Sequence, residues 1–125
     1  MGKFVIKTAK SGNPFFSLKA SNGQVIGVSE MYNSMTACKN GIESVRKNAP
    51  IAGIEDQTIE GYQNIPNPAF ELYKGKNGEF YFRLKAKNGE PILRSEGYKG
   101  KDGCKNGIAS VKRNAPDALV IEEEK

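Results

Sequence analysis

Apolar and polar positions alternate over two short segments near the start of the chain and then change to a helical period. Residues 4–7 form one alternating run, and in a second run Phe16, Leu18 and Ala20 alternate with a mostly polar set. This pattern predicts strands with one buried face. A third strand is expected at about residues 24–30, a helix at about 35–48, and a last strand after the helix.

Asn-Gly pairs mark the turn between the second and third expected strands. Asn22-Gly23 and, later in the chain, Asn88-Gly89 predict type I′ turns, in which both central residues have positive φ. Pro91 follows the later pair and lacks the N–H that a strand ladder uses. We therefore expect the later third strand to start late or to lie at an irregular edge.

The helical segments have recognisable ends. Ser34 fits an N-cap, and Pro50 disfavours helical geometry in the residue before it, so the first helix should close near Asn48. In the later helix, glycines 100 and 103 replace the serine cap and an alanine. That helix is expected to start less firmly.

A glycine lies in the middle of the apolar face of each helix. At these positions, Gly41 and Gly107, glycine costs about 1 kcal/mol relative to alanine. The recurrence in both helices predicts a close approach of the helix backbone to the sheet or to the other helix.

The whole pattern occurs twice. Residues 4–56, the first repeat, align without a gap on residues 70–122, the second repeat, with 24 identities in 53 positions. Residues 57–69 are a linker by composition. A unit of about 55 residues buries little apolar surface alone, so residues 1–125 are expected to form a single domain around a shared core.

Two motifs carry a resemblance to a known family. Asn-Gly-x-x-Ile-x-x-Ser-Glu-x-Tyr followed by Lys-Asn-Gly-Ile-x-Ser-Val-x-x-Asn-Ala occurs in both repeats, and it resembles the YegP-like family of small uncharacterised bacterial proteins. The resemblance implies an α+β fold: two tandem β3-αβ repeats in a single antiparallel-rich sheet, with two helices packed on one face. It also implies that the last strands, at about residues 52–57 and 118–123, are exchanged between the halves. The family has no assigned activity.

Composition narrows the possible chemistry. The chain has a net charge of +5 and contains no histidine, which removes the usual general base and the commonest zinc ligand. Cys38 and Cys104 hold equivalent helical positions, where small buried thiols are expected. No catalytic residue, metal site or cofactor is predicted. No apolar run is long enough to cross a membrane, so we expect a cytoplasmic protein without membrane contact. A monomer is expected because the tandem repeats satisfy within one chain the association that single-repeat relatives need two chains to achieve.

A polar stripe runs along the border of each helix's apolar face. Its members are spaced by four residues: Asn40, Ser44 and Asn48 in the first helix, and Asn106, Ser110 and Asn114 in the second. The stripe is a candidate binding site. The structural alternative is that it ties each helix to a neighbouring loop, with its last asparagine tolerating left-handed geometry at the helix end.

A second candidate surface mixes cations with an aromatic ring. Its members are Tyr81, Arg83, Lys85 and Lys87 on one expected strand, with Lys105, Lys112 and Arg113 on the second helix. Single-stranded RNA or DNA binds such surfaces by stacking and phosphate contact. The equivalent strand of the first repeat carries far less charge, which favours a solvated strand face instead.

These features support a non-enzymatic binding or interaction module, with an unknown protein or small molecule as its partner. Single-stranded nucleic-acid binding is the alternative reading. An enzyme of unrecognised class is a second alternative, because perturbed Glu or Lys side chains can be catalytic without a sequence motif.

Overall fold

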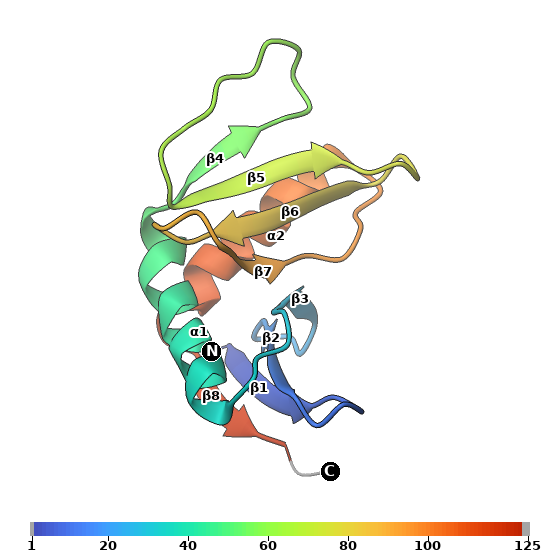
Figure 1. Cartoon of the computed structure of the whole chain (residues 1–125). Coiled ribbons are helices and arrows are strands. Elements are labelled where there is room, and N and C mark those ends of the chain that lie inside the picture. The colour runs from blue at the N-terminus through green and yellow to red at the C-terminus, as the bar shows by residue number, and fades with distance from the viewer. Residues whose placement is uncertain (1, 124–125) are drawn as a thin grey trace.

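The computed structural model describes residues 2–123 and has an α+β fold, as predicted (Figure 1). The first repeat contains β1 (Lys3–Thr8), β2 (Pro14–Lys19), β3 (Val25–Val28), α1 (Met35–Asn48), the 3-10 turn η1 (Ala49–Ile51) and β4 (Gly53–Asp56). The second contains β5 (Ala69–Lys74), β6 (Phe80–Lys85), β7 (Pro91–Arg94), α2 (Lys101–Asn114) and β8 (Leu119–Glu122). Both repeats therefore give the predicted order of elements.

The strands described by the structure form one mixed sheet in the order β4-β5-β6-β7-β3-β2-β1-β8. Its centre is the antiparallel pairing of β3 with β7. The last strand of each repeat lies in the half of the sheet that the other repeat builds: β4 pairs in parallel with β5, and β8 pairs in parallel with β1. Below, the first half of the sheet means β8, β1, β2 and β3, and the second half means β4 to β7.

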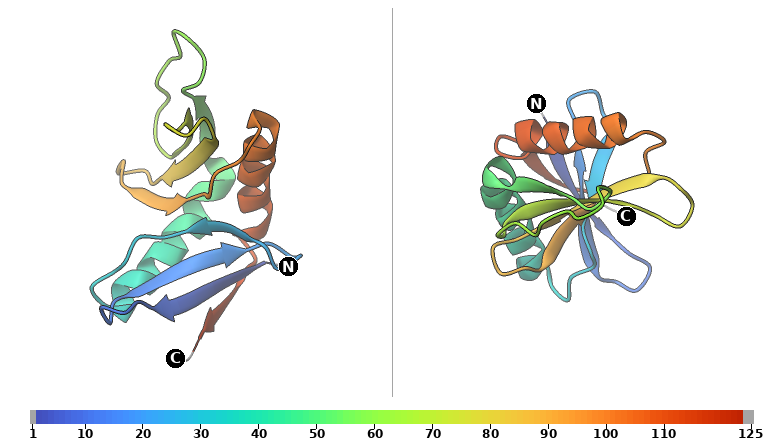
Figure 2. Two further views of the ribbon diagram at one scale, coloured as in Figure 1. Left: turned by 90° about the vertical axis from the view of Figure 1, so that its right-hand side faces the viewer. Right: turned by 90° about the horizontal axis from the view of Figure 1, so that it is seen from above.

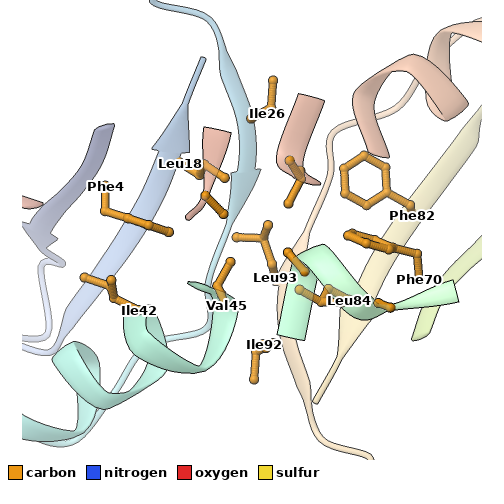
Figure 3. Packing of buried hydrophobic residues seen from close by; sticks show 14 of the residues in the cluster. Phe4, Leu18, Ile26, Ile42, Val45, Phe70, Phe82, Leu84, Ile92 and Leu93 are labelled. Carbon is orange, nitrogen blue, oxygen red and sulfur yellow. The ribbon is translucent and has the colours of Figure 1, made fainter. Parts of the chain in front are cut away.

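Both helices lie on the same side of the strongly twisted sheet (Figure 2). Helix α1 contacts β2 and β7, and α2 contacts β3, β5 and β6, so each helix touches strands of both repeats. Buried side chains of both repeats form one continuous cluster (Figure 3). Its largest members include Phe4, Phe16, Phe70 and Phe82, all fully buried. The other side of the sheet is called the open face below.

The turns after the second strands differ from the predicted type. Gly23 has a φ of 86°, but no non-glycine residue in the described chain has positive φ, so Asn22 does not supply the second positive φ of a type I′ turn. Instead, the Gly23 N–H donates to the carbonyl of Ala20, and the Ala20 N–H donates to Gln24. This is the pattern of a type I turn followed by a left-handed glycine bulge. The Asn22 side chain accepts a hydrogen bond from the Gln24 N–H at 3.0 Å.

The expectation that Pro91 delays its strand was wrong. Strand β7 begins at Pro91, just as β3 begins at the equivalent Val25. Both strands show a register shift against their neighbour at the same place. The irregularity thus belongs to the repeat and leaves room for a residue without a ladder donor.

The helices begin and end near the predicted residues, and their central glycines approach the sheet as expected, at Phe16 of β2 and Phe82 of β6, but approach a tyrosine ring more closely still. Ser34 caps α1 by accepting a hydrogen bond from the Ala37 N–H at 3.1 Å, whereas Gly100 offers α2 no side-chain cap. A Cβ on Gly41 would lie 2.2 Å from Tyr32 Oη. The glycine therefore accommodates a tyrosine ring from the preceding loop, and the twin pair of Gly107 and Tyr98 is alike.

Candidate functional site: two clefts between each helix and the opposite hairpin

The polar stripe forms its own hydrogen bonds within each helix. Asn48 Nδ2 donates to the Ser44 carbonyl at 2.7 Å and to Ser44 Oγ at 3.1 Å. The twin pair, Asn114 and Ser110, has the same bonds at 2.8 and 3.1 Å. Asn48 remains in right-handed helical geometry, so the expected left-handed role is wrong. These bonds fix both side chains against the helix, and Asn114 also accepts a hydrogen bond from Ser21 Oγ at 3.4 Å, which ties α2 to the β2–β3 turn.

The first cleft lies between α1 and the β6–β7 hairpin of the second repeat. It has a volume of about 390 Å³. Asn40 and Ser44 line it from the helix, and Asn88 and Glu90 line it from the hairpin. The loop before α1 adds Glu30, Met31 and Tyr32. The cleft thus joins polar side chains from both repeats, which no single repeat could bring together.

The second cleft lies between α2 and the β2–β3 hairpin of the first repeat, where two adjoining cavities of about 490 and 430 Å³ are found. The larger is lined by Ser110 and Asn114 from the helix and by Asn22 from the hairpin turn. Ser21 Oγ and Asn114 Oδ1 lie 3.4 Å apart across it. The smaller cavity is lined by Gln24, Val25, Ile26, Glu96, Gly97 and Tyr98. The two clefts are therefore related by the internal duplication.

Residues that are identical in the two repeats gather at the first cleft. Of the twelve residues lining the first cleft, eight are identical to their equivalents in the other repeat: Glu30, Tyr32, Asn40, Gly41, Ser44, Ala86, Asn88 and Ile92. Over the whole alignment, fewer than half of the positions are identical, 24 of 53. Some of the eight are needed for the turn or the core, but Glu30 and Asn40 are exposed.

The tyrosines on the floor of the clefts are part of the packing as well as the lining. The Tyr32 ring stacks on Phe16, with centroids 6.1 Å apart, and Tyr98 stacks on Phe82 at 6.3 Å. Burial, followed by the nearby Cys38 and Glu30, raises the pKa of Tyr32. The Tyr32 hydroxyl is thus protonated at neutral pH and can donate one hydrogen bond.

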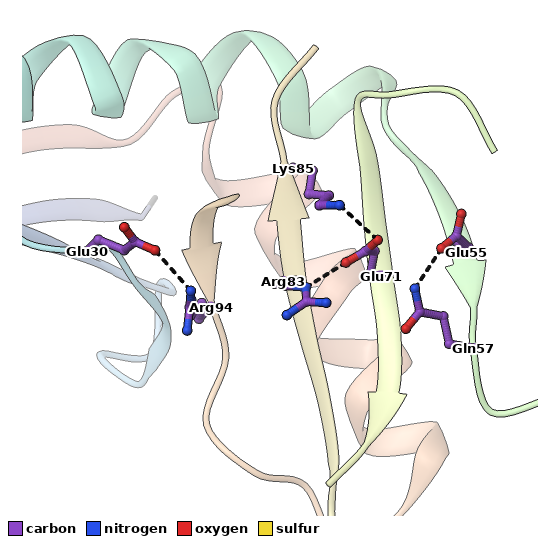
Figure 4. A network of polar contacts seen from close by, with 7 residues as sticks. All are labelled: Glu30, Glu55, Gln57, Glu71, Arg83, Lys85 and Arg94. Atoms are coloured by element: carbon purple, nitrogen blue, oxygen red, sulfur yellow. Dashed lines mark hydrogen bonds and ion pairs between the residues drawn. The ribbon is translucent and has the colours of Figure 1, made fainter. Parts of the chain in front are cut away.

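The basic and aromatic surface predicted from the sequence is divided between the two sides of the sheet. Tyr81, Arg83 and Lys85 follow β6 on the open face, where Glu71 of β5 lies between the two cations (Figure 4). Arg83 Nε lies 2.6 Å from Glu71 Oε1, and Lys85 Nζ lies 3.3 Å from Glu71 Oε2. Tyr81 stacks on Tyr73, over which the Arg83 guanidinium lies at 5.0 Å.

Glu71 is ionised at neutral pH in this setting. Burial alone would raise the pKa of Glu71, but the hydrogen bonds and charges of Arg83 and Lys85 outweigh it and hold the pKa below its ordinary value. One buried carboxylate therefore neutralises much of the charge that the sequence suggested for this strand.

The remaining cations of the predicted surface lie elsewhere. Lys105 is exposed on α2, and Lys87 is exposed in the β6–β7 turn. Lys112 Nζ donates to the Ala52 carbonyl at 2.7 Å, which joins α2 to the start of β4. Arg113 lines the second cleft. The structure does not bring these residues together with the open-face row.

Nucleophilic and metal-ligating groups are few in the described part of the chain. Cys38 and Cys104 are free and buried, and burial raises the pKa of the Cys104 thiol to about 11. A thiol of this kind is a weak nucleophile at neutral pH. Between residues 2 and 123, no group of three or more Cys, Asp or Glu side chains is placed to hold a metal ion. None of the helices described is long and apolar enough to span a membrane.

Sequence reasoning missed the arrangement that the clefts depend on. The stripe residues were identified, but their opposite wall comes from the hairpin of the other repeat. Only the pairing of β3 with β7 places that hairpin there. The recurrence of Glu30 and Tyr32 as Glu96 and Tyr98 was the available signal, because both recur beside the stripe.

Comparison with known proteins places this chain in a family. Residues 9–56 and 76–122 match the model of a domain of unknown function, DUF1508. The UPF0339 protein YegP of Yersinia pestis is 40% identical over 120 residues, which cover 96% of this chain and 94% of that protein. A UPF0339 protein of Mannheimia succiniciproducens is 42% identical over 120 residues, covering 96% of this chain and 93% of the relative.

Solved structures agree with this assignment. The solution NMR structure of the protein of unknown function yegP from E. coli has a TM-score of 0.80 and 34% identity, and the match covers 98% of this chain and 92% of that one. A UPF0339 protein from Shewanella oneidensis has a TM-score of 0.78 and 31% identity, with 97% and 90% covered. The sequence match and the shared fold together show that this chain belongs to the DUF1508 family, the UPF0339 proteins that include YegP.

Proposed function

We propose that the protein is a non-enzymatic binding module whose two clefts each hold a small polar compound without negative charge. The observation that carries this proposal is the gathering of repeat-identical residues at the first cleft, including exposed ones such as Glu30 and Asn40. Packing of the core does not explain identity at these exposed positions.

The chemistry of the lining supports this ligand class. In the first cleft, Asn40 and Asn88 offer amide donors and acceptors, Ser44 and Tyr32 offer hydroxyls, and the lining includes two carboxylates but no cation. Glu30 is paired with Arg94 at 2.9 Å, but Glu90 forms no ion pair with a described residue and disfavours an anionic ligand there. Arg113 lines the second cleft together with Asp117, so a neutral or cationic polar compound suits both.

The absence of a catalytic step in the proposal follows from the groups available. The two thiols are buried, and burial raises the pKa of Tyr32, which keeps its hydroxyl protonated at neutral pH and unavailable as a general base. Binding by hydrogen bonds requires none of these groups to change protonation state.

An NMR titration tests the proposal. Nucleosides, monosaccharides and spermidine serve as probes, and inorganic phosphate serves as the anionic control. We expect one neutral or cationic probe to shift the backbone amides of Asn40 and Ser44 together with that of Asn88, because the two walls belong to one site. Asn40→Ala should weaken this binding about tenfold, as expected for loss of a hydrogen-bonding partner.

Thr36→Ala is the matched control, because Thr36 is exposed on the same helix one turn earlier and does not line the cleft. It should leave the affinity unchanged. The proposal is wrong if no neutral or cationic probe shifts these amides, or if Asn40→Ala binds as well as the unaltered protein.

A further inference from the structure

The two edges of the sheet differ in how they are covered. Beside β4, the linker folds back: the Ile65 N–H donates to Glu55 Oε1 at 2.9 Å, and Gln57 Nε2 donates to Glu55 Oε2 at 2.7 Å. Ile65 also lies against Gly53, where an added Cβ would be 3.0 Å from Ile65 Cδ1. The linker thus covers part of the open face beside β4.

The opposite edge, β8, is open along the described chain. Leu119, Val120 and Ile121 are 55%, 41% and 38% exposed. The N–H groups of Leu119 and Glu123 donate to the carbonyls of Gly2 and Ile6. Successive residues of a strand direct their backbone groups to opposite sides, so the N–H and C=O groups of Val120 and Glu122 point away from β1. An apolar edge strand with free ladder groups is a template for pairing with another chain.

The open face next to β8 carries unpaired positive charge. A cavity of about 310 Å³ there is lined by residues that include Lys3, Val5, Lys19 and Ile121. Neither lysine forms an ion pair with another described residue. Glu123 also lines this cavity, but it lies 3.9 Å from Lys7.

The second half of the sheet shows what these lysines lack. Lys85, the equivalent of Lys19, is paired with Glu71. The equivalent of Glu71 in the first half is Val5, which brings no carboxylate. The first half therefore places Lys19 among apolar residues without the carboxylate that pairs with its equivalent, Lys85.

We propose that β8 accepts an extended segment of a partner protein as an added strand, with an acidic side chain of that segment reaching across Leu119 toward Lys3. An apolar side chain two residues away would lie beside Ile121, because alternate side chains of a strand share one face. Main-chain bonds to Val120 and Glu122 would supply affinity, and Lys3 would supply the choice of segment. This surface is separate from the clefts.

Two labelled peptides test the proposal. The acidic probe is Lys-Thr-Ile-Val-Glu-Thr, and its control, Lys-Thr-Ile-Val-Lys-Thr, replaces the glutamate by lysine. We expect fluorescence anisotropy to show that the acidic peptide binds at least tenfold more tightly at low salt, where opposite charges attract over longer distances. Equal binding of both peptides, or binding of neither, would overturn the proposal.

Two variants locate the binding. Lys3→Glu should weaken the acidic peptide about tenfold, whereas Lys105→Glu makes the same charge change on exposed α2 and should have little effect. Val120→Pro removes an outward donor without removing a bond to β1, and it should also weaken binding. If the lysine variant and Val120→Pro both bind the acidic peptide normally while circular dichroism shows them folded, the β8 edge is not the docking surface.

A second copy of this chain is the competing occupant of the β8 edge. Sedimentation at rising protein concentration separates the two cases. A monomer across the range supports docking of a partner segment, whereas a dimer that Val120→Pro dissociates assigns the edge to self-pairing and overturns the proposal.

Discussion

The two halves of the sheet are alike on the face that packs against the helices and different on the open face. Toward the helices, Phe4 and Phe16 correspond to Phe70 and Phe82, all fully buried. On the open face, one row in register across the sheet reads Ile121, Val5, Ser17 and Val28 in the first half, and Arg94, Arg83, Glu71 and Glu55 in the second.

This difference separates what the fold needs from what each surface can do. In the second half, Glu71 forms ion pairs with both Arg83 and Lys85, so that these polar side chains are paired within the chain. In the first half, Ser17 stands at the position equivalent to Arg83. Among the buried side-chain nitrogen and oxygen atoms of the described residues, Ser17 Oγ is the one without a hydrogen-bond partner. The first half is therefore the side that a partner can still complete.

The largest expected effect tests the similarity of the helix-facing side. Gly41→Leu and Gly107→Leu each force out a tyrosine ring, because even a Cβ would lie 2.2 or 2.3 Å from the tyrosine Oη. We expect each to lower the free energy of unfolding by about 3 kcal/mol, at the upper end for overpacking. Urea denaturation measures this. If only one of the two variants lost stability, the packing of the tyrosine against α1 and against α2 would not be equivalent.

A smaller effect is expected from the open face of the second half. Glu71→Gln should lower the free energy of unfolding at neutral pH by about 2 kcal/mol, because two partly buried cations lose their carboxylate. The pKa of Glu71 is lower in the folded protein than its ordinary value, so its stabilisation is present above the unfolded pKa and lost as pH falls through the folded pKa.

The difference in the free energy of unfolding between Glu71→Gln and the unaltered protein should therefore become smaller at acid pH. Val5→Ala, at the equivalent position of the first half, is the control. It removes buried apolar volume, and its cost should stay constant over the same pH range. Parallel stability curves for Glu71→Gln and the unaltered protein from neutral to acid pH would contradict the role given to Glu71.

The beginning of α2 offers a stabilising change. The nearest atom to a Cβ added on Gly103 is Tyr98 Cδ1 at 3.5 Å, an ordinary van der Waals distance. Gly103→Ala, which restores the residue type of the first repeat, should raise the free energy of unfolding by about 1 kcal/mol. Thermal melting followed by circular dichroism checks this, and a lower melting temperature would mean that α2 requires the glycine.

The smallest expected effect concerns nucleic acid. Because Glu71 neutralises the β6 cations, we expect single-stranded RNA to bind weakly at low salt. Glu71→Gln should strengthen binding about threefold, because it frees one cation to bind a phosphate group. Titration of labelled RNA at two salt concentrations measures the change. Tight RNA binding by the unaltered protein that Lys85→Glu abolishes would restore the alternative reading of this face.

Local pattern predicted most of the elements because periodicity and helix ends depend on neighbouring residues. Ser34 caps α1 as expected, and the α+β fold with a single sheet is confirmed. The turn at Asn22-Gly23 was misjudged because one positive φ, at glycine, is enough when a bulge follows. The role of Pro91 was misjudged because the register shift that accommodates it cannot be read from composition.

The site was predicted less completely because it depends on contacts between repeats. The stripe residues Ser44 and Asn48 could be found by their spacing, but not the hairpin that faces them. Arg83 and Lys85 were assigned to one face correctly, yet their neutralisation by Glu71 required the register of β5 against β6. Cross-strand neighbours are set by the whole sheet.

The covalent joining of the two repeats has a consequence for how this fold can evolve. In a symmetric pair of identical single-repeat chains, every substitution appears on both subunits, so a glutamate placed at the position of Glu71 would also replace Val5. One continuous chain removes that coupling. It permits one half to become a self-contained support while the other specialises, and the shared interior keeps the specialised half folded.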